Sequence, residues 1–392
     1  MDRRQVLLLG AATLGASLAA PRILRASPNS GISDSEIMLG SVMPVTGPVR
    51  IASEPYELGI RSVFESVNDA GGINGRKLSW QVEDDAYQTN RAVAAAKKLV
   101  ERDDVFMIFG QHGTPTGFAM APYVEQMGVP MMMTTAGPSP LKKYVFGGLA
   151  PYSAIAYQLT NYLLKGKFKN VGLLYQNDEL GEAGRLGIGK SMKENDAELG
   201  ADVGFERTTT DFSSQVLKIR DSGADAVIVL ASGPSFASII KTANGLGVKP
   251  QWATYSVASI RSVRDLLGTA IDGIVYASEI DSPDSDEAGV VECGKLLEKY
   301  HPKVKLDWGS MLGYAHARLL VRALKEMGND ITRDGLVSTF EKMHGVETGT
   351  TSPMGFSPTN HNAPAALKIF QYELQKPVAK SDWLDVSNFT AE

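Results

Sequence analysis

Cysteine and histidine are both scarce in this sequence. The 392 residues include one cysteine, Cys293, and five histidines, which are scattered and show no H-x-x-x-H spacing. A single cysteine excludes an intrachain disulfide, and a structural zinc site would lack its usual sulfur and imidazole ligands. We therefore expect Cys293 to be an unreactive, buried thiol, and we expect no metal or other cofactor.

An excess of positive charge is also absent. The chain has 39 Lys and Arg residues against 44 Asp and Glu residues, which gives a formal net charge of -5. Because no basic cluster offsets this balance, nucleic acid is not expected as a partner. The hydrophobic fraction of 43% is ordinary for a soluble protein, and the length suffices for one core and more naturally for two. We predict no stable insertion into a membrane.

Motifs of common enzyme classes are missing as well. The sequence has no G-x-S-x-G elbow and no zinc motif, and Cys293 lies in a helical stretch with no obvious base beside it. Asp84 and Asp85 could form a metal-binding or catalytic pair. No third ligand lies nearby in the sequence, so we expect both to orient a turn between a strand and a helix. The sequence thus predicts a protein without catalytic activity.

The N-terminus has the pattern of an export signal. Arg3 and Arg4 precede an apolar stretch of small residues that is too short to span a bilayer. The arginine pair resembles a twin-arginine signal, and a general secretory signal is the alternative. We expect residues 1–26 to be removed by cleavage after Ala26, with Ala20 as a competing site. No cysteine lies near this junction, so we expect a free, soluble protein in the periplasm.

Apolar runs of strand length alternate with amphipathic stretches of helical period from residue 36 onward. Such alternation predicts β-α-β units, in which helices cover parallel strands. The pattern starts again after Pro151, so we expect two lobes, each a doubly wound parallel sheet. The first block has strands at 36–43, 78–83, 105–109 and 129–134, and helices at 54–69, 90–102 and 114–127. The second has helices at 152–164, 182–198, 213–222 and 235–245, and strands at 171–175, 203–207, 226–230 and 251–255.

A glycine-rich turn at 71–78 carries the most specific signal. Its sequence, GGINGRKL, resembles the G-G-I-x-G-x-x-L turn of the branched-chain amino acid binding proteins, a family of type I periplasmic binding proteins. The paired glycines end one helix, and Asn74 and Gly75 make a turn into the next strand. Other segments extend the resemblance over nearly the whole chain: 44–48 (PVTGP), 84–85 (DD), 109–110 (FG), 128–130 (GVP), 211–213 (DFS) and 223–226 (GADA).

This resemblance implies an α/β fold of two doubly wound parallel-sheet lobes joined by a three-strand hinge. The crossings would fall near Ala150, Ser278 and Ser352. Lobe one would then comprise 34–149 plus 280–350, and lobe two 150–279 plus 351–392. The resemblance also implies a monomeric solute-binding protein that delivers a small molecule to the membrane permease of an ABC transporter. A subunit that presents its ligand to a sensor kinase is the alternative.

In that family a carboxylate clamp on lobe one holds the ligand. By resemblance, the clamp consists of Thr114, beside Gly113 at a helix N-terminus, and of Thr135, Ala136 and Gly137. Exposed N–H groups and the positive end of a helix favour an anion without the need for a buried cation. The alternative for Thr114 is a plain N-cap, and both roles can coexist.

Two positions depart from the amino-acid binders of the family. Leu180 stands where they have an aromatic residue, and Ser235 stands where they have an acid that pairs with the ligand's ammonium group. An ammonium group enclosed without an anionic partner would be costly to desolvate. These departures favour a small carboxylic acid that lacks the amine. Branched-chain or other amino acids, and solutes of amide or urea type, are the alternatives.

Several large side chains are candidates for the wall of the site. Ala52 takes a position that is often aromatic in the family, which leaves room for a larger ligand. Tyr152, Phe236 and Tyr255 are expected on loops of lobe two and could stack on a ring, or could merely pack the edges of the cleft. Arg50 could pair with an anionic ligand or lie in solvent. Together these residues favour an aromatic or other bulky hydrophobic carboxylate.

Overall fold

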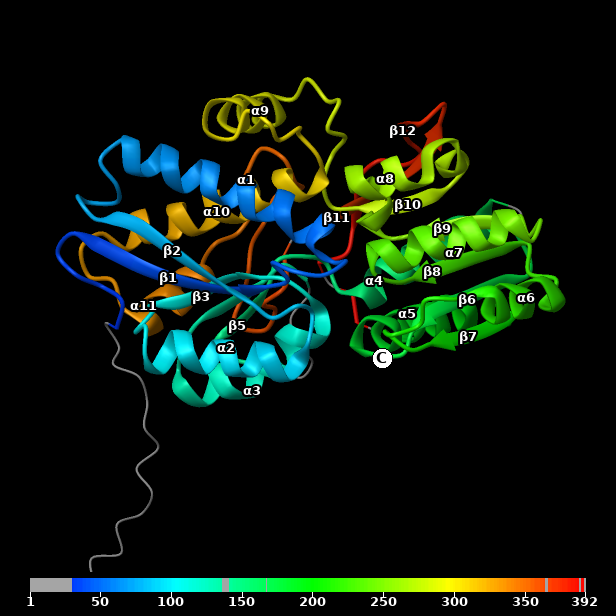
Figure 1. The fold of residues 1–392 in the computed structure, drawn as a ribbon, viewed down its shortest axis with the longest axis horizontal. Coiled ribbons are helices and arrows are strands. Elements are labelled where there is room, and N and C mark those ends of the chain that lie inside the picture. Colours follow the sequence, from blue (N-terminus) through cyan, green and yellow to red (C-terminus); the bar gives the residue numbers. More distant parts are fainter. Residues whose placement is uncertain (1–29, 136–140, 167, 364–365, 388, 391–392) are drawn as a thin grey trace, which may run out of the picture.

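The structure is a computed structural model that describes residues 30–135, 141–166, 168–363, 366–387 and 389–390. The expected export segment 1–26 lies outside the described residues, as do Ala136 and Gly137. Two lobes lie side by side along the longest axis, and each is built on its own sheet (Figure 1).

The first lobe contains a five-stranded sheet in the order β2-β1-β3-β4-β5, with all neighbouring strands parallel. All residues of β3 and β4 are buried, as expected of parallel strands covered on both faces. Figure 1 shows α1 and α10 over one face of this sheet and α2 and α3 over the other. The strands are β1 (Glu36–Met43), β2 (Lys77–Asp84), β3 (Met107–Gln111), β4 (Met131–Met133) and β5 (Val145–Gly147). The helices are α1 (Arg50–Asp69), α2 (Thr89–Glu101), α3 (Thr114–Met127), α9 (Ala288–Tyr300), α10 (Trp308–Met327) and α11 (Arg333–Phe340).

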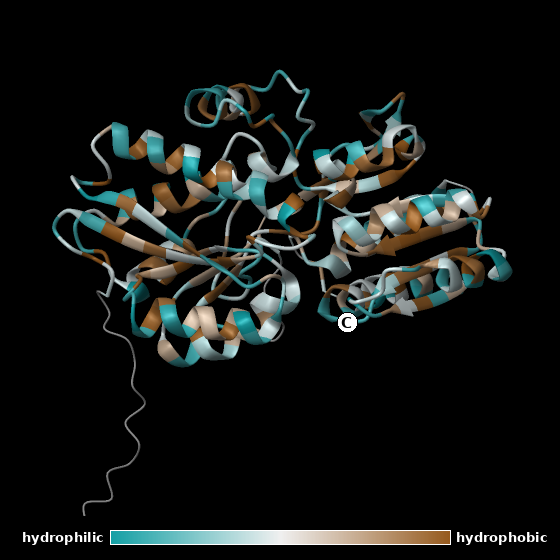
Figure 2. Ribbon diagram, in the orientation of Figure 1, coloured by the Kyte–Doolittle hydropathy of each residue, from teal (hydrophilic) through white to brown (hydrophobic). Residues whose placement is uncertain are grey.

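The second lobe contains a sheet in the order β12-β11-β10-β9-β8-β6-β7, with β13 paired to β11. The strands from β7 to β10 are parallel, whereas β10, β11 and β12 pair antiparallel. Figure 2 shows hydrophobic strands at the middle of this lobe, between helices that carry hydrophilic residues as well. The strands are β6 (Val171–Gln176), β7 (Ala201–Phe205), β8 (Ala226–Leu230), β9 (Gln251–Thr254), β10 (Val275–Ser278), β11 (Ala366–Glu373), β12 (Lys376–Ala379) and β13 (Leu384–Asp385). The helices are α4 (Tyr152–Lys165), α5 (Glu179–Glu194), α6 (Ser213–Ser222), α7 (Gly233–Gly245) and α8 (Arg261–Leu267), with 3-10 turns η1 (Ser256–Ser259) and η2 (Gly268–Ile271).

The predicted fold class is confirmed. The chain passes between the sheets three times: after β5, after β10 and before β11. Two of these crossings touch, because the N–H of Ser352 donates to the main-chain oxygen of Glu279 over 3.1 Å, and Ile280 forms a bridge with Thr351. The antiparallel strands β11 to β13 are an addition that the sequence did not predict. Within the described part of the chain, every helix is too short or too polar to cross a bilayer.

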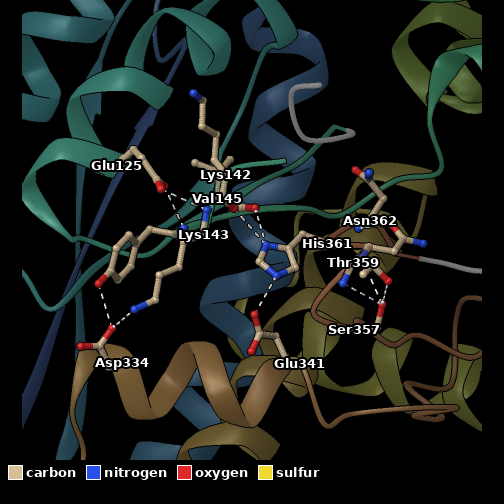
Figure 3. Close-up of polar contacts among 12 residues, drawn as sticks. Glu125, Lys142, Lys143, Val145, Asp334, Glu341, Ser357, Thr359, His361 and Asn362 are labelled. Carbon is tan, nitrogen blue, oxygen red and sulfur yellow. Dashed lines mark hydrogen bonds and ion pairs between the residues drawn. The ribbon is translucent and has the colours of Figure 1, made fainter. Parts of the chain in front are cut away.

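Residues 353–363, which the sequence assigns to lobe two, lie against the first lobe. The Nδ1 of His361 lies 3.1 Å from the oxygen of Lys142 and 3.2 Å from that of Val145, and its Nε2 lies 3.2 Å from Glu341 Oε1 (Figure 3). The imidazole ring also stacks on Phe146, with 4.1 Å between the ring centroids. The structure therefore places this segment with β5 and α11, and the other proposed lobe boundaries stay a prediction.

Candidate ligand-binding site

A cavity lies between the two lobes, at the carboxyl ends of the strands. This is where open α/β sheets bind ligands, because the loops that follow the strands converge there. The space between the atoms, its opening included, is about 570 Å³. The lining residues come from both lobes: Val49, Ala52, Tyr87, His112, Gly113, Thr114, Thr134, Thr135, Leu149, Tyr152, Leu180, Ser232, Gly233, Tyr255, Val257, Ile260 and Trp308.

Thr114 does not have the N-cap role that the sequence left open. The N-cap of α3 is Gly113, which has a φ of 118° and no side chain that could cap the helix. Thr114 is the first helical residue, and its hydroxyl instead donates across the cleft to Tyr152 Oη over 3.4 Å. The hydroxyl thus points into the cavity, where a ligand oxygen could replace the tyrosine as its partner.

Two polar groups in the cavity wall are buried and make no hydrogen bond within the described protein: Thr135 Oγ1 and Trp308 Nε1. The hydroxyl of the neighbouring Thr134, by contrast, donates to the oxygen of Gln111 over 2.7 Å. A buried polar group without a partner costs free energy, so both groups are suited to bind a polar ligand atom. The sequence predicted Thr135 but not Trp308, which reaches the cavity from the start of α10, far along the chain.

The second lobe contributes an aromatic and aliphatic wall. The rings of Tyr152 and Tyr255 meet edge to face, with centroids 5.3 Å apart and planes at 77°. Tyr255 Oη donates to the oxygen of Ala231 over 2.8 Å, and burial raises the pKa of both tyrosines, which keeps them neutral. Leu180 completes this wall and is 3% exposed. Three of the predicted contacts therefore lie together.

Three other predicted residues lie elsewhere. Phe236, a residue of α7, is fully buried in the core of the second lobe and does not line the cavity. Ser235 lines a neighbouring groove, where its hydroxyl accepts a hydrogen bond from Ser232. Arg50 is bound to the acids of its own helix, with Nη1 2.6 Å from Glu57 Oε2 and Nη2 3.4 Å from a Glu54 oxygen.

The described part of the cavity lining carries no formal charge. None of the described residues that line the cavity is Asp, Glu, Lys or Arg. Burial lowers the pKa of His112 to about 4, so its ring is neutral at physiological pH. A buried acid, Glu279, lies in the hinge behind the wall, and burial raises its pKa to about 7. Glu279 was not predicted from the sequence, because nothing local distinguishes it from a surface glutamate.

One segment matches a nucleotide-binding motif by its letters alone. Residues 184–191 read GRLGIGKS, the G-x-x-x-x-G-K-S pattern of a phosphate-binding loop. The segment lies inside α5 rather than between a strand and a helix, so its N–H groups belong to the helix ladder. It therefore lacks the loop geometry that cradles phosphate. The described residues also contain no group of three His, Cys, Asp or Glu side chains placed to hold a metal ion.

Comparisons with known proteins agree with this architecture. A family model described as "Periplasmic binding protein" matches residues 36–377. The "Leu/Ile/Val-binding protein homolog 8" of Brucella suis is 24% identical over 391 residues, which cover 94% of each chain.

Solved structures of similar fold are described with different ligands. A branched chain amino acid ABC transporter protein from Thermus thermophilus with bound valine has a TM-score of 0.82 and 17% identity, covering 91% of this chain and 98% of that one. A fatty acid ABC transporter substrate-binding protein from Thermomonospora curvata has a TM-score of 0.82 and 21% identity, covering 94% and 97%. A solute binding protein from R. palustris in complex with benzoate has a TM-score of 0.80 and 20% identity, covering 90% and 98%. At these identities the likeness establishes the fold.

Proposed function

The chain belongs to the periplasmic binding protein family, and on that premise we propose that it binds a small carboxylate without an α-amino group in the cavity between its lobes. In this proposal it is exported, works as a monomer and delivers its ligand to the permease of an ABC uptake transporter. The two lobes close around the ligand by bending at the three crossings.

The absence of charge on the described cavity lining carries this proposal. An α-amino acid would bring an ammonium group into a closed space in which no lining residue is an acid, and the desolvation cost would have no compensation. A carboxylate has suitable partners in the hydroxyls of Thr114 and Thr135, the indole N–H of Trp308 and the N-terminus of α3.

The rest of the ligand is aromatic or otherwise bulky and hydrophobic in this proposal. Tyr152, Tyr255 and Leu180 offer ring faces, ring edges and methyl groups, and Ala52 leaves space on the opposite side. Two structural neighbours, one in complex with benzoate and one named as a fatty acid transporter's substrate-binding protein, support this class. A branched-chain amino acid is the second candidate, because the neighbour from Thermus thermophilus holds valine and the Brucella relative is named for Leu, Ile and Val.

We infer no catalytic role. The single thiol, Cys293, is fully buried, and burial raises its pKa, so it is not a thiolate nucleophile. Its sulfur lies 3.9 Å from the main-chain oxygen of Ser310, as expected of a structural cysteine.

A ligand panel tests the proposed class. The purified mature protein is melted and titrated with benzoate, phenylacetate, hexanoate, leucine and valine. We expect the acids without an amine to raise the melting temperature, because a ligand at about a hundredfold its Kd stabilises the folded state by about 2.7 kcal/mol. Tight binding of leucine or valine in calorimetry, with no binding of the other acids, would overturn the proposal in favour of the second candidate.

Paired variants of Thr114 test the clamp. Thr114→Val keeps the shape of the side chain and removes the hydroxyl, so we expect a loss of about 1.5–3 kcal/mol, or roughly ten- to a hundredfold in affinity. Thr114→Ser should retain most of the affinity. Thr160→Val is a matched control, since that buried hydroxyl serves α4 by donating to Ala156. Because Gly113 is the N-cap, the ligand-free Thr114→Val protein should melt close to wild type. Wild-type affinity in Thr114→Val would refute the clamp assignment.

A further inference from the structure

A second hollow adjoins the cavity on its outer side. This groove has about 1210 Å³ of space, its opening included, and both lobes line it. Its lining includes the polar residues Gln88, Asn90, Arg207, Thr209 and Ser235. Among the residues that the structure describes, three line both the inner cavity and the outer groove: Val49, Tyr87 and Ser232. Tyr87 has the largest side chain of the three and therefore forms most of the partition.

The backbone that carries Tyr87 is held in an unusual conformation. Ala86 and Tyr87 have φ values of 47° and 62°, a left-handed region that residues other than glycine rarely occupy. The preceding acids hold the turn, because Asp84 Oδ1 accepts the N–H of Ala86 over 2.9 Å and Asp85 Oδ1 accepts that of Tyr87 over 2.7 Å. The expectation that Asp84 and Asp85 orient this turn is confirmed. Strained backbone of this kind clusters at ligand-binding sites, where it fixes a side chain in place.

The ring of Tyr87 lies over the start of the clamp. A Cβ atom added at Gly113 would lie 2.9 Å from Cε2 and 3.2 Å from Cδ2 of Tyr87, so the ring packs directly on this glycine. Thr114 is the next residue and lines the same cavity. On its other side the ring meets the second lobe, with the guanidinium carbon of Arg207 5.9 Å from the ring centroid. Tyr87 thus extends from lobe one to lobe two, beside the predicted carboxylate position.

We propose that Tyr87 is the wall that sets the maximum length of the ligand, an inference that rests on the proposed function of the inner cavity. The ring is fixed by its turn and by Gly113, so a ligand held at Thr114 cannot extend past it into the outer groove. Short acids fit within the inner cavity, and longer acids are excluded. Removal of the ring joins the two spaces and admits a longer chain, whose far end meets the polar groups of the groove.

The test uses a series of acids of increasing length: benzoate, phenylacetate, 3-phenylpropanoate and 4-phenylbutanoate. Calorimetry is run on wild type, Tyr87→Ala, Tyr87→Phe and Tyr123→Ala, the last a control for loss of a tyrosine elsewhere in the lobe, on α3. For wild type we expect a longest acid that still binds well, and we expect the next longer acid of the series to bind with roughly tenfold or more lower affinity. Tyr87→Ala should shift that limit to longer acids, and Tyr87→Phe and Tyr123→Ala should keep the wild-type limit. Should Tyr87→Ala fold poorly, Tyr87→Gly relieves the left-handed backbone and keeps the same comparison.

The outcomes separate this inference from the proposed function. An unchanged length limit in Tyr87→Ala and Tyr87→Gly overturns the assignment of Tyr87 even when short acids bind as proposed. If wild type binds amino acids instead, the proposed function fails. The same variants are then titrated with alanine, valine, leucine and phenylalanine. A size limit that is the same in wild type and Tyr87→Ala again overturns the assignment of Tyr87 as the wall. If wild type binds neither series, both proposals are overturned.

Discussion

Glu279 is expected to make the stability of this protein depend on pH. The residue follows β10 in the hinge and is 0% exposed, and its carboxylate has no well-aligned hydrogen bond to a described group, although the N–H groups of Glu279 and Ala150 partly oppose the rise of its pKa. Burial raises its pKa from the ordinary value of 4.5 to about 7. Its main-chain oxygen binds the N–H of Ser352, so the side chain lies where two crossings of the hinge meet.

The size of the effect follows from this shift. Between about pH 4.5 and pH 7 the folded protein keeps a proton that the unfolded chain has lost, so stability falls as pH rises, by up to roughly 1.4 kcal/mol per pH unit. Above about pH 7 the accumulated cost is constant at about 3 kcal/mol. Glu279→Gln resembles the protonated acid and cannot ionise. We therefore expect it to match wild type near pH 4.5 and to be more stable by up to about 3 kcal/mol near pH 8.

Urea unfolding of both proteins at several pH values between about 5 and 8 measures this difference. Burial lowers the pKa of His112 and of His316 to about 4, and both histidines make stability fall as pH decreases below 6.5. That opposing contribution is common to wild type and variant, so it cancels in the difference. Glu298→Gln, at an exposed position on α9, is the matched control for the loss of one carboxylate at the surface. A flat difference for Glu279→Gln, or a variant less stable than wild type near pH 8, would refute the reasoning.

Lobe closure, helix packing and the C-terminal segment each give one more prediction. A saturating ligand should reduce the radius of gyration in small-angle scattering, and an unchanged radius would count against closure at the hinge. Gly59→Ala should lower the free energy of unfolding, measured in urea, by about 1–3 kcal/mol, because its Cβ would lie 2.2 Å from the oxygen of Ser310 on α10. Gly189→Ala is the control: it has open space around it and should be neutral or stabilising. His361→Phe keeps the stack on Phe146 but removes the contacts of the imidazole with the carbonyls of Lys142 and Val145 and with Glu341, so chemical unfolding should show a loss of about 1–3 kcal/mol with ligand affinity unchanged.

The sequence by itself determined the strands and turns that are specified by residues close together in the chain. The strand predicted at 36–43 is β1 (Glu36–Met43), because its apolar residues fill a strand buried between neighbours on both sides. The glycine-rich turn at 71–78 also required no tertiary information. Gly71, Gly72, Asn74 and Gly75 all have positive φ values, which those residue types tolerate best. Repeated β-α units then predicted two doubly wound lobes, and the family resemblance predicted the hinge between them.

Other elements lacked a local signal. The helix expected from residue 54 begins at Arg50, because the chain turns at Gly47 and enters α1 without an N-cap side chain. Strand β11 was not predicted, since its partner β10 lies about ninety residues earlier in the chain, and β12 and β13, which were not predicted either, both pair with β11. Short segments of this kind become strands only when an existing sheet edge is available to receive them.

Only the tertiary structure decided which residues line the cavity. Thr114, Thr135 and Leu180 were predicted from the resemblance, and Tyr152 and Tyr255 from their places on loops of lobe two. All five line one cavity, because strand ends from both lobes converge there. Trp308 and Tyr87 were not predicted, and Phe236 and Ser235 were placed in the cavity by analogy with positions that here point elsewhere. Periodicity specifies which face of an element is buried. It does not specify which distant element covers that face, because this depends on the order in which the strands pair and on the angle at which the lobes meet.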